Sequence, residues 1–378
     1  MARELRKSIV LTGMVLGALL VAAKGLGDPK ASLSGACSPQ RDQHYVVASR
    51  DQLDTLLGCH LEGITIGLEP GFYGRMTLQD IKGLTLTSTD PTKPASFEAI
   101  NIKGGNRVTL THLNLEGSIT GLTYRLQILS STDINASKLN LVGGGDYSQG
   151  APGGAFIRWG NRVSLTGLKV SLVVNGIKFS DSSQVTISDN IIRDFRSDAI
   201  QGTATSQLLI SGNYISGAHP VPGDHPDGIQ LFTLEKQTSA SDIVIRDNLI
   251  ERGAGGLMQG IFIGARDENP YINLQITKNM VIGSLYHGLS VAGARGGEVR
   301  DNVVVPIGGQ KNWILLVNVA SFALEGNVAQ ELIKDKIQLV PGRGLGKNRR
   351  FITPEAQAIV ASNAWKDKHF PAELRDGR

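Results

Sequence analysis

The sequence lacks a strong excess of charge of either sign outside its two ends. The formal net charge is +4, but residues 1–23 contribute +2, and residues 331–378 hold ten Lys or Arg against six Asp or Glu. The central chain is therefore close to neutral, without the clustered basic residues of nucleic-acid-binding proteins. The glycine-rich stretches "GGGD" at 143 and "GAGG" at 253 precede no predicted helix, so they do not form a phosphate-binding loop. Neither nucleic acids nor nucleotides are expected partners.

Apolar runs of transmembrane length are also missing. The run from Ile9 to Ala23 has 15 residues, fewer than the roughly 20 that cross a bilayer as a helix. It follows a positively charged start and ends in Ala22-Ala23, a pattern typical of a cleaved signal peptide over residues 1–23. We therefore expect a secreted or periplasmic protein, with an uncleaved N-terminal anchor as the alternative.

Cysteine and aromatic residues are scarce. The two cysteines, Cys37 and Cys59, flank the first predicted helix. In an exported protein this arrangement predicts a disulfide that staples the N-terminal cap, and two buried free thiols are the alternative. Aromatic residues make up 5% of the chain, which leaves few rings for stacking on sugars and counts against a binder of neutral glycans.

Glycine is abundant, with 46 residues. The chain also repeats one phrase, for example "SQVTISDNIIRDF" at 183. The asparagine of this phrase recurs at spacings of 23 to 35 residues, at Asn190, Asn213, Asn248, Asn279, Asn302 and Asn327. A second phrase runs in step with it, as "NGIKF" (175), "DAIQG" (198), "DGIQL" (227), "QGIFI" (259) and "HGLSV" (287). Two repeats in register predict an all-β solenoid of stacked coils. Each asparagine is expected at a bend, where its amide bonds to the next coil.

Both ends of such a solenoid need covering, because an open end exposes apolar core and strand edges. Residues 24–99 are expected to form an N-terminal cap with the first coils, and they include a short helix in "SRDQLDTLLGC" followed by "GITIGLEPGFYG". Residues 100–330 form the solenoid. The basic segment 331–378 breaks the repeat, and we expect it to supply a loop and a short helix as the C-terminal cap.

These features resemble the right-handed parallel β-helix superfamily of polysaccharide-active proteins, whose members begin with a capping helix and a phrase similar to "GITIGLEPGFYG". The likeness implies a single-stranded, right-handed parallel β-helix. A weaker similarity links "PDGIQL" and "YHGLSVAG" to polygalacturonase motifs, which implies functional roles for Asp227 and His287. The coil between them has Gln259 and Gly260 where those hydrolases carry two aspartates.

Stacking of the second phrase creates a polar column. Asp198 and Asp227 are expected to point outward about 5 Å apart on neighbouring coils, beside the outward-facing Lys178, Gln201 and Gln230. Two carboxylates at this distance share a proton, hold a cation or act as acid and base. The alternative is that each aspartate only caps a turn.

Further candidates lie in loops near this column. The insertion "SGAHPVPGDHPD" adds Asp224 and His225 to the rim, and insertions in solenoids commonly border the binding face. Arg266 and Arg295 follow two strands in matching places. They could clamp a carboxylate or sulfate, or else form ordinary surface ion pairs.

The leading hypothesis is an exported lyase that cleaves an acidic, uronate-containing polysaccharide by β-elimination. The uronate carboxylate would be neutralised by Gln201, Gln230, Arg266 or a calcium ion. Such an ion would be held by Asp198, Asp224 and Asp227. The candidate bases are Lys178, His225 and His287, and Tyr286 is the candidate acid.

Two other functions stay open. One is a glycoside hydrolase that uses Asp198 and Asp227, whose expected separation suits a retaining pair. The other is a non-catalytic glycan-binding or surface-assembly protein. The sequence leaves the oligomeric state open, a monomer included.

Overall fold

The structure, a computed structural model, describes residues 37, 43–145, 150–233, 238–350 and 355–369. The predicted signal peptide lies outside these residues. Within them, no helix is long and apolar enough to cross a membrane.

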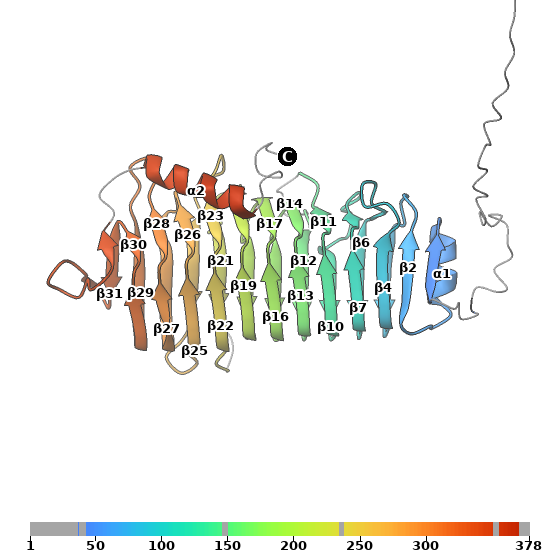
Figure 1. Ribbon diagram of the computed structural model, residues 1–378, viewed down its shortest axis with the longest axis horizontal. Coiled ribbons are helices and arrows are strands. Elements are labelled where there is room, and N and C mark those ends of the chain that lie inside the picture. Colours follow the sequence, from blue (N-terminus) through green and yellow to red (C-terminus); the bar gives the residue numbers. More distant parts are fainter. Residues whose placement is uncertain (1–36, 38–42, 146–149, 234–237, 351–354, 370–378) are drawn as a thin grey trace, which may run out of the picture.

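The chain winds into an all-β parallel solenoid of about 12 turns, which confirms the predicted fold class (Figure 1). A complete turn contributes one strand to each of three faces, and neighbouring turns pair in parallel. Face 1 comprises β3 (Arg75–Gln79), β6 (Ala99–Lys103), β9 (Tyr124–Leu129), β12 (Gly153–Arg158), β15 (Ile177–Ser180), β18 (Ile200–Thr203), β21 (Asp227–Phe232), β24 (Gln259–Gly264), the starts of β27 (Tyr286–Arg300) and β29 (Asn312–Glu325), and β31 (Glu331–Lys334).

Face 2 comprises β1 (His44–Val47), β2 (Ile64–Leu68), β4 (Lys82–Ser88), β7 (Asn106–Thr111), β10 (Thr132–Ser137), β13 (Asn161–Thr166), β16 (Ser183–Ser188), β19 (Ser206–Ser211), β22 (Ser241–Arg246), β25 (Tyr271–Thr277) and the ends of β27 and β29. Face 3 comprises β5 (Ser96–Phe97), β8 (Asn114–Leu115), β11 (Asn140–Val142), β14 (Lys169–Val173), β17 (Ile191–Phe195), β20 (Tyr214–Ala218), β23 (Leu249–Glu251), β26 (Met280–Ile282), β28 (Val303–Val305), β30 (Val328–Ala329) and β33 (Arg349–Arg350).

The core runs along the axis of the solenoid. Strands alternate between buried and outward side chains, as in β16, where Val185 and Ile187 are fully buried. Because one coil cannot bury such residues alone, stacking supplies the stabilisation, at about 25 cal/mol for each Å² of apolar surface removed from water. One continuous cluster of these side chains extends from β1 to the C-terminal loop.

A ladder of buried asparagines follows the corner between faces 2 and 3. The side-chain Nδ2 of each asparagine donates to Oδ1 of the asparagine one coil further on, at 2.8–3.0 Å. This confirms the predicted role of the repeated asparagine. The ladder runs from Asn190 to Asn348, so it includes one more coil than the sequence pattern indicated.

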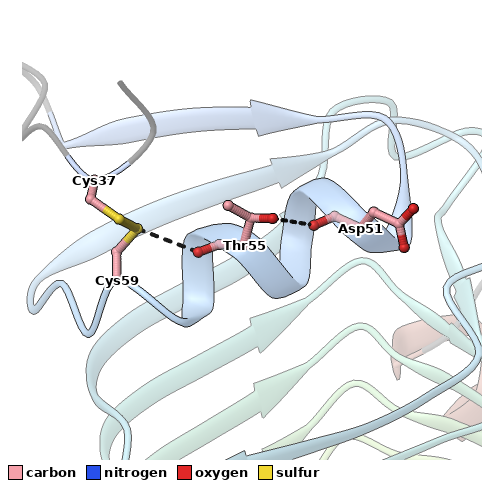
Figure 2. Close-up of a disulfide and its surroundings, with 4 residues drawn as sticks. All are labelled: Cys37, Asp51, Thr55 and Cys59. Atoms are coloured by element: carbon pink, nitrogen blue, oxygen red, sulfur yellow. Dashed lines mark hydrogen bonds between the residues drawn. A yellow bond between two sulfur atoms is a disulfide. The ribbon is translucent and has the colours of Figure 1, made fainter. Parts of the chain in front are cut away.

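The N-terminal end is covered by α1 (Arg50–Leu57). Ser49 caps this helix by accepting a hydrogen bond from the backbone of Gln52, and Leu53 and Leu56 pack into the core. Figure 2 shows the disulfide between Cys37 and Cys59, which joins a residue before β1 to the second residue after α1. The predicted disulfide is therefore confirmed, and the predicted capping helix is present.

The C-terminal segment covers two surfaces. Leu339 and Leu345, in the loop after β31, join the core and close the end of the solenoid; the loop includes β32 (Ile337–Gln338), which pairs antiparallel with β31. The predicted C-terminal helix, α2 (Glu355–His369), lies lengthwise along the outside of face 3 (Figure 1).

Face 3 carries an outward apolar stripe where α2 lies. The stripe consists of Ile191, Tyr214, Leu249, Ile282 and Val305, and Trp365 of the helix packs against it. The outward positions of the preceding coils are polar instead, as at Asn140 and Lys169. The change from polar to apolar residues thus marks the coils that the helix covers.

Candidate active site

The two aspartates of the polar column lie at the corner between face 3 and face 1 (the 3–1 corner). Asp227 is the first residue of β21, and Asp198 comes two residues before β18. The strands are in register through Ile200 and Ile229, and the backbone N–H of Asp227 donates to Oδ1 of Asp198 at 2.9 Å. The structure therefore brings the two predicted carboxyl groups together on neighbouring coils.

Two glutamines cover these carboxyl groups. Gln201 donates to Oδ2 of Asp198 at 2.6 Å, and Gln230 donates to Oδ2 of Asp227 at 2.6 Å. The amide nitrogen of Gln201 also donates to Oε1 of Gln230 at 2.8 Å. Asp198 is only 3% exposed and Asp227 only 1%. The expectation of an exposed carboxylate face is wrong, because the longer amide side chains fold over the shorter acids.

Burial changes the acidity of both groups. Removal from water raises the pKa of Asp198 to about 6, although a backbone hydrogen bond and the positive charge of Lys178 oppose the rise. Burial together with the negative charge of Asp198 raises the pKa of Asp227 to about 8. At neutral pH the pair therefore holds one proton in common.

The pattern of hydrogen bonds is consistent with a protonated Asp227. Its Oδ1 is buried and has no hydrogen-bond partner among the described residues, and the same holds for Oε1 of Gln259. Asp227 and Gln259 are paired in register on adjacent strands. An ionised carboxylate with an unpartnered buried oxygen would be costly, so a neutral acid is the more stable form.

The pair should make the folded protein less stable as the pH rises. Both groups hold protons more tightly in the folded protein than in the unfolded chain, where the pKa of aspartate is about 4. Their contribution to stability is therefore complete below pH of about 4 and is lost as the pH rises through about 6 and about 8. We expect Asp227→Asn to raise Tm by several degrees at pH 9 and by roughly a degree or less at pH 5.

Thermal unfolding of both proteins from pH 4 to pH 9 measures this difference. Asp242→Asn, at an exposed aspartate of face 2, is the matched control. Equal changes in Tm at pH 5 and pH 9 would contradict a raised pKa at Asp227.

The insertion loop is fixed by an ion pair. Arg196 binds Asp224 through two nitrogens, at 2.7 and 3.1 Å, and Asp224 also accepts the backbone N–H of Val221 at 3.1 Å. Arg196 keeps the pKa of Asp224 below its usual range. Asp224 is thus committed to holding the loop, and His225 beside it is exposed.

The predicted calcium site is not formed. Among the residues that the structure describes, no three His, Cys, Asp or Glu side chains are grouped so as to hold a metal ion. Asp224 is bound to Arg196, while Asp198 and Asp227 accept hydrogen bonds from the two glutamines. A calcium ligand set from these three aspartates is therefore a wrong prediction.

A cleft of about 400 Å³ lies at the 3–1 corner, next to Asp198. Tyr124 and Asn175 line it together with the ion pair of Arg196 and Asp224. Ser197, the residue before Asp198, also lines the cleft. The cleft thus borders the residue before Asp198 and includes the fixed insertion loop in its wall, while neither buried acid lines it.

Comparison with known proteins decides the family. A family model described as "Right handed beta helix region" matches residues 73–221 and 154–304, which together span more than half of the chain. The chain belongs to the right handed beta helix family. A search of curated protein sequences finds no significant match.

Among solved structures, one tailspike shares this fold with a TM-score above 0.5. The Dettilon tailspike protein aligns with a TM-score of 0.54 at 11% identity, over 75% of this chain and 58% of the tailspike. The surface adhesin PfbA of Streptococcus pneumoniae gives 0.49 at 12%, over 75% and 89% of the two chains. The periplasmic alginate epimerase AlgG gives 0.41 at 12%, over 72% and 63%. This β-helix spans less than two thirds of the tailspike and of the epimerase, and likeness at such low identity shows the fold alone.

His287 lies away from the two acids of the β-helix, in an aromatic cluster. Its Nδ1 accepts a hydrogen bond from Nε1 of Trp313 at 3.2 Å, and its ring contacts Phe262 and Trp313 edge-on. Burial lowers the pKa of His287, so the ring is neutral near pH 7 and holds its proton on Nε2. Nε2 is then a donor, which argues against the predicted role as base.

The other predicted residues divide between the site, the corner that follows face 1 and the part of β27 on face 2. Lys178 pairs in register with Gln201, one coil before the acids. Arg266 follows the end of β24, and Arg295 lies deep in β27 with Nη2 3.4 Å from the carbonyl oxygen of Asp267. Both arginines are therefore separated from the acids by the length of a strand, and the structure gives them no part in the site.

Proposed function

We propose that this β-helix is an exported enzyme that cleaves an acidic, uronate-containing polysaccharide at the 3–1 corner, with Asp227 and Asp198 as the catalytic pair. The observation that carries the proposal is a pair of buried carboxyl groups on neighbouring coils, where the backbone N–H of Asp227 donates to Oδ1 of Asp198 at 2.9 Å. Burial raises the pKa of both groups, to about 8 for Asp227 and about 6 for Asp198. Environments that separate two pKa values in this way assign one group as acid and the other as base or nucleophile.

Hydrolysis is the reaction that this pair supports best. Asp227 donates its proton to the glycosidic oxygen as the bond to the anomeric carbon breaks. The ionised Asp198 either attacks that carbon or takes a proton from the attacking water. Gln201 and Gln230 cover both carboxyl groups, so their amides must exchange present hydrogen bonds for substrate hydroxyls.

β-Elimination is the second candidate, and Lys178 favours it. The positive charge of Lys178 acts on Asp198 and would attract a uronate carboxylate to the same place. The neutral Asp227 would then hydrogen-bond that carboxylate while Asp198 removes the C5 proton. The C4–C5 double bond forms as the C4–O bond breaks, and the departing oxygen takes a proton from water. The two reactions differ in their products, because elimination leaves an unsaturated uronate and hydrolysis leaves only a new reducing end.

Export is part of the proposal. The disulfide between Cys37 and Cys59 supports it, because disulfides persist mainly in oxidising compartments. Polysaccharides are also found mostly outside the cytoplasm, so the compartment and the substrate agree.

The deciding experiment incubates the protein with alginate, polygalacturonate, hyaluronan and chondroitin sulfate from pH 4 to pH 10, recording reducing ends and ultraviolet absorbance together. We expect reducing ends to increase with a bell-shaped pH profile whose limbs lie near pH of about 6 and about 8. Parallel absorbance would assign elimination. Binding without any cleavage over the whole range would overturn the enzyme assignment in favour of a glycan-binding protein.

A further inference from the structure

Two buried oxygens at the starts of β21 and β24 lack a donor among the described residues. They are Oδ1 of Asp227 and Oε1 of Gln259. The two residues are register partners, so they lie side by side on neighbouring coils. A buried acceptor without a donor costs free energy, because it has given up water and gained no bond in return. A proton on Oδ1 of Asp227 is a donor at this place, and Gln259 on the adjacent strand supplies the acceptor.

The hydrogen bonds of the other glutamines leave Oδ1 as the position for this proton. Gln201 donates to Oε1 of Gln230 at 2.8 Å, and Gln230 in turn donates to Oδ2 of Asp227 at 2.6 Å. Because Oδ2 already accepts an N–H, a proton on Oδ2 would compete with that donor, whereas a proton on Oδ1 does not. Hydrogen bonds that follow one another in a chain polarise each other, so the donor at Oδ2 strengthens an O–H at Oδ1.

The titratable and charged groups around Asp227 come from four places in the fold. They are Lys178 of β15, Arg196 and Asp198 between β17 and β18, Asp224 and His225 in the insertion loop, and Tyr286 and His287 at the start of β27. Asp224 is paired with Arg196, and the ring of His287 is neutral near pH 7 because burial lowers its pKa. None of these described groups donates to Oδ1 of Asp227, whereas the negative charge of Asp198 favours the protonated form of Asp227.

An amide suits position 259 better than a carboxyl group. A third carboxyl group beside Asp198 and Asp227 would add like-charge repulsion and would itself take up protons. The amide of Gln259 carries no charge, and its Oε1 accepts hydrogen bonds over the whole pH range. Gln259 can therefore receive a hydrogen bond from Asp227 without competing for the proton.

We propose that Gln259 is a positioning residue, which accepts a hydrogen bond from a proton on Oδ1 of Asp227 and so fixes where the acid pair holds its proton. This placement of the proton requires no substrate. Its use in catalysis rests on the proposed function. In hydrolysis the glycosidic oxygen takes the place of Oε1 of Gln259 and receives the proton, while the electron pair of the breaking bond to the anomeric carbon goes to that oxygen. Asp227 is left ionised.

The test compares Gln259→Met with the parent protein in thermal unfolding from pH 5 to pH 9. Methionine keeps the length of the side chain and removes its polar groups. While Asp227 is protonated, the substitution leaves a buried O–H without an acceptor, and this loss disappears as the pH rises through about 8. We expect Tm to fall by several degrees at pH 5 and by roughly a degree or less at pH 9.

Two further variants control for packing. In the Asp227→Asn background the side-chain amide at position 227 donates at every pH, so the effect of Gln259→Met should no longer depend on pH. Gln127→Met is the matched control, at a glutamine of β9 on face 1 whose amide donates to the hydroxyl of Thr123, and its effect on Tm should be the same at pH 5 and pH 9. A loss for Gln259→Met that is equal at both pH values, or larger at pH 9, overturns the inference.

The pH profile of cleavage separates this inference from the proposed function. Loss of a hydrogen bond to the neutral acid lowers the pKa of Asp227, so Gln259→Met should move the basic limb of the kcat profile to lower pH by about one unit. Cleavage that depends on Asp227 with an unmoved basic limb leaves the function standing and removes the role of Gln259. The expected pH dependence of Tm, without cleavage of any polymer, leaves the proton on Asp227 and removes the function.

Discussion

Replacing Asp227 with asparagine is expected to lower kcat for polysaccharide cleavage by about 10³-fold, because general acid catalysis typically contributes 10²- to 10⁴-fold. Asparagine keeps the size of the side chain and can still accept the hydrogen bond from Gln230, but it has no acidic proton to give. The substrate contacts remain, so KM should change little. Initial rates at pH 7, measured from reducing ends, give both constants.

The partner acid distinguishes catalysis from structure. Asp198→Asn should cause a loss of similar size and remove the acidic limb of the pH profile, since Asp198 has the lower pKa of the pair. In the control, Asp194→Asn changes an aspartate of β17 on face 3 that pairs with His219, and it should leave kcat within about twofold, as expected for a surface site. Retention of wild-type kcat by Asp227→Asn would remove the catalytic pair altogether.

Replacing Asn248 with alanine is expected to reduce the free energy of unfolding by about 3–5 kcal/mol, through buried groups that lose their partners. Oδ1 of Asn248 accepts both the backbone N–H and the Nδ2 of Asn213, and its own Nδ2 donates to Asn279 and to the carbonyl of Ile210. The substitution therefore removes the acceptor of two buried donors of Asn213, while Oδ1 of Asn279 keeps the backbone N–H of residue 248. Urea unfolding followed by circular dichroism measures the loss.

The loss of stability depends on whether the substituted asparagine belongs to the buried ladder. Asn135→Ala, at an exposed asparagine of β10 on face 2, should change stability by about 0.5 kcal/mol or less. If the two substitutions destabilise the protein equally, the ladder does not stabilise the stack of coils in the way its hydrogen bonds indicate.

The fold could be predicted because the repeat is a direct consequence of stacking. Each coil must place apolar side chains inward and an amide at the same bend, so the period of the repeat is visible in the sequence. Asn348 was missed because its coil, "LGKNRRF", keeps the asparagine but lacks the aliphatic strand that precedes it elsewhere. Only its contact with Asn327 identifies it.

The site could be predicted less completely. The alternation of inward and outward side chains along β21 predicts that Gln230 points outward and that Asp198 and Asp227 lie near each other. It does not predict how deeply the two carboxyl groups are buried. Their burial depends on how the glutamine side chains fold over the acids, and the repeat pattern does not predict this conformation. Arg266 and Arg295 were misplaced for a related reason. They occupy matching places after two strands, whereas the two acids lie at or just before the starts of strands. The repeat therefore relates the arginines to each other and not to the acids.

Trp313 was not predicted either. Its coil, "NWILLV", lacks the glycine that marks the other copies of the second phrase. The register also shifts by one residue between His287 and Leu289, so counting from the aliphatic positions misaligns the two strands. The partial phrase before "ILLV" is the only signal that could have indicated an aromatic neighbour for His287.

The helix α2 changes the order in which the coils should unfold. A solenoid in which each coil contacts only its neighbours can fray from an end, one coil at a time. Here Lys366 forms an ion pair with Glu251 of β23 and lies over the ring of Tyr214 of β20, while Trp365 packs on the stripe of face 3. The helix thus fastens several coils at once, and none of them can detach before it is released. The coils beneath it should exchange their amide hydrogens as one cooperative block, whereas the coils from β1 to β14 should exchange in a gradient.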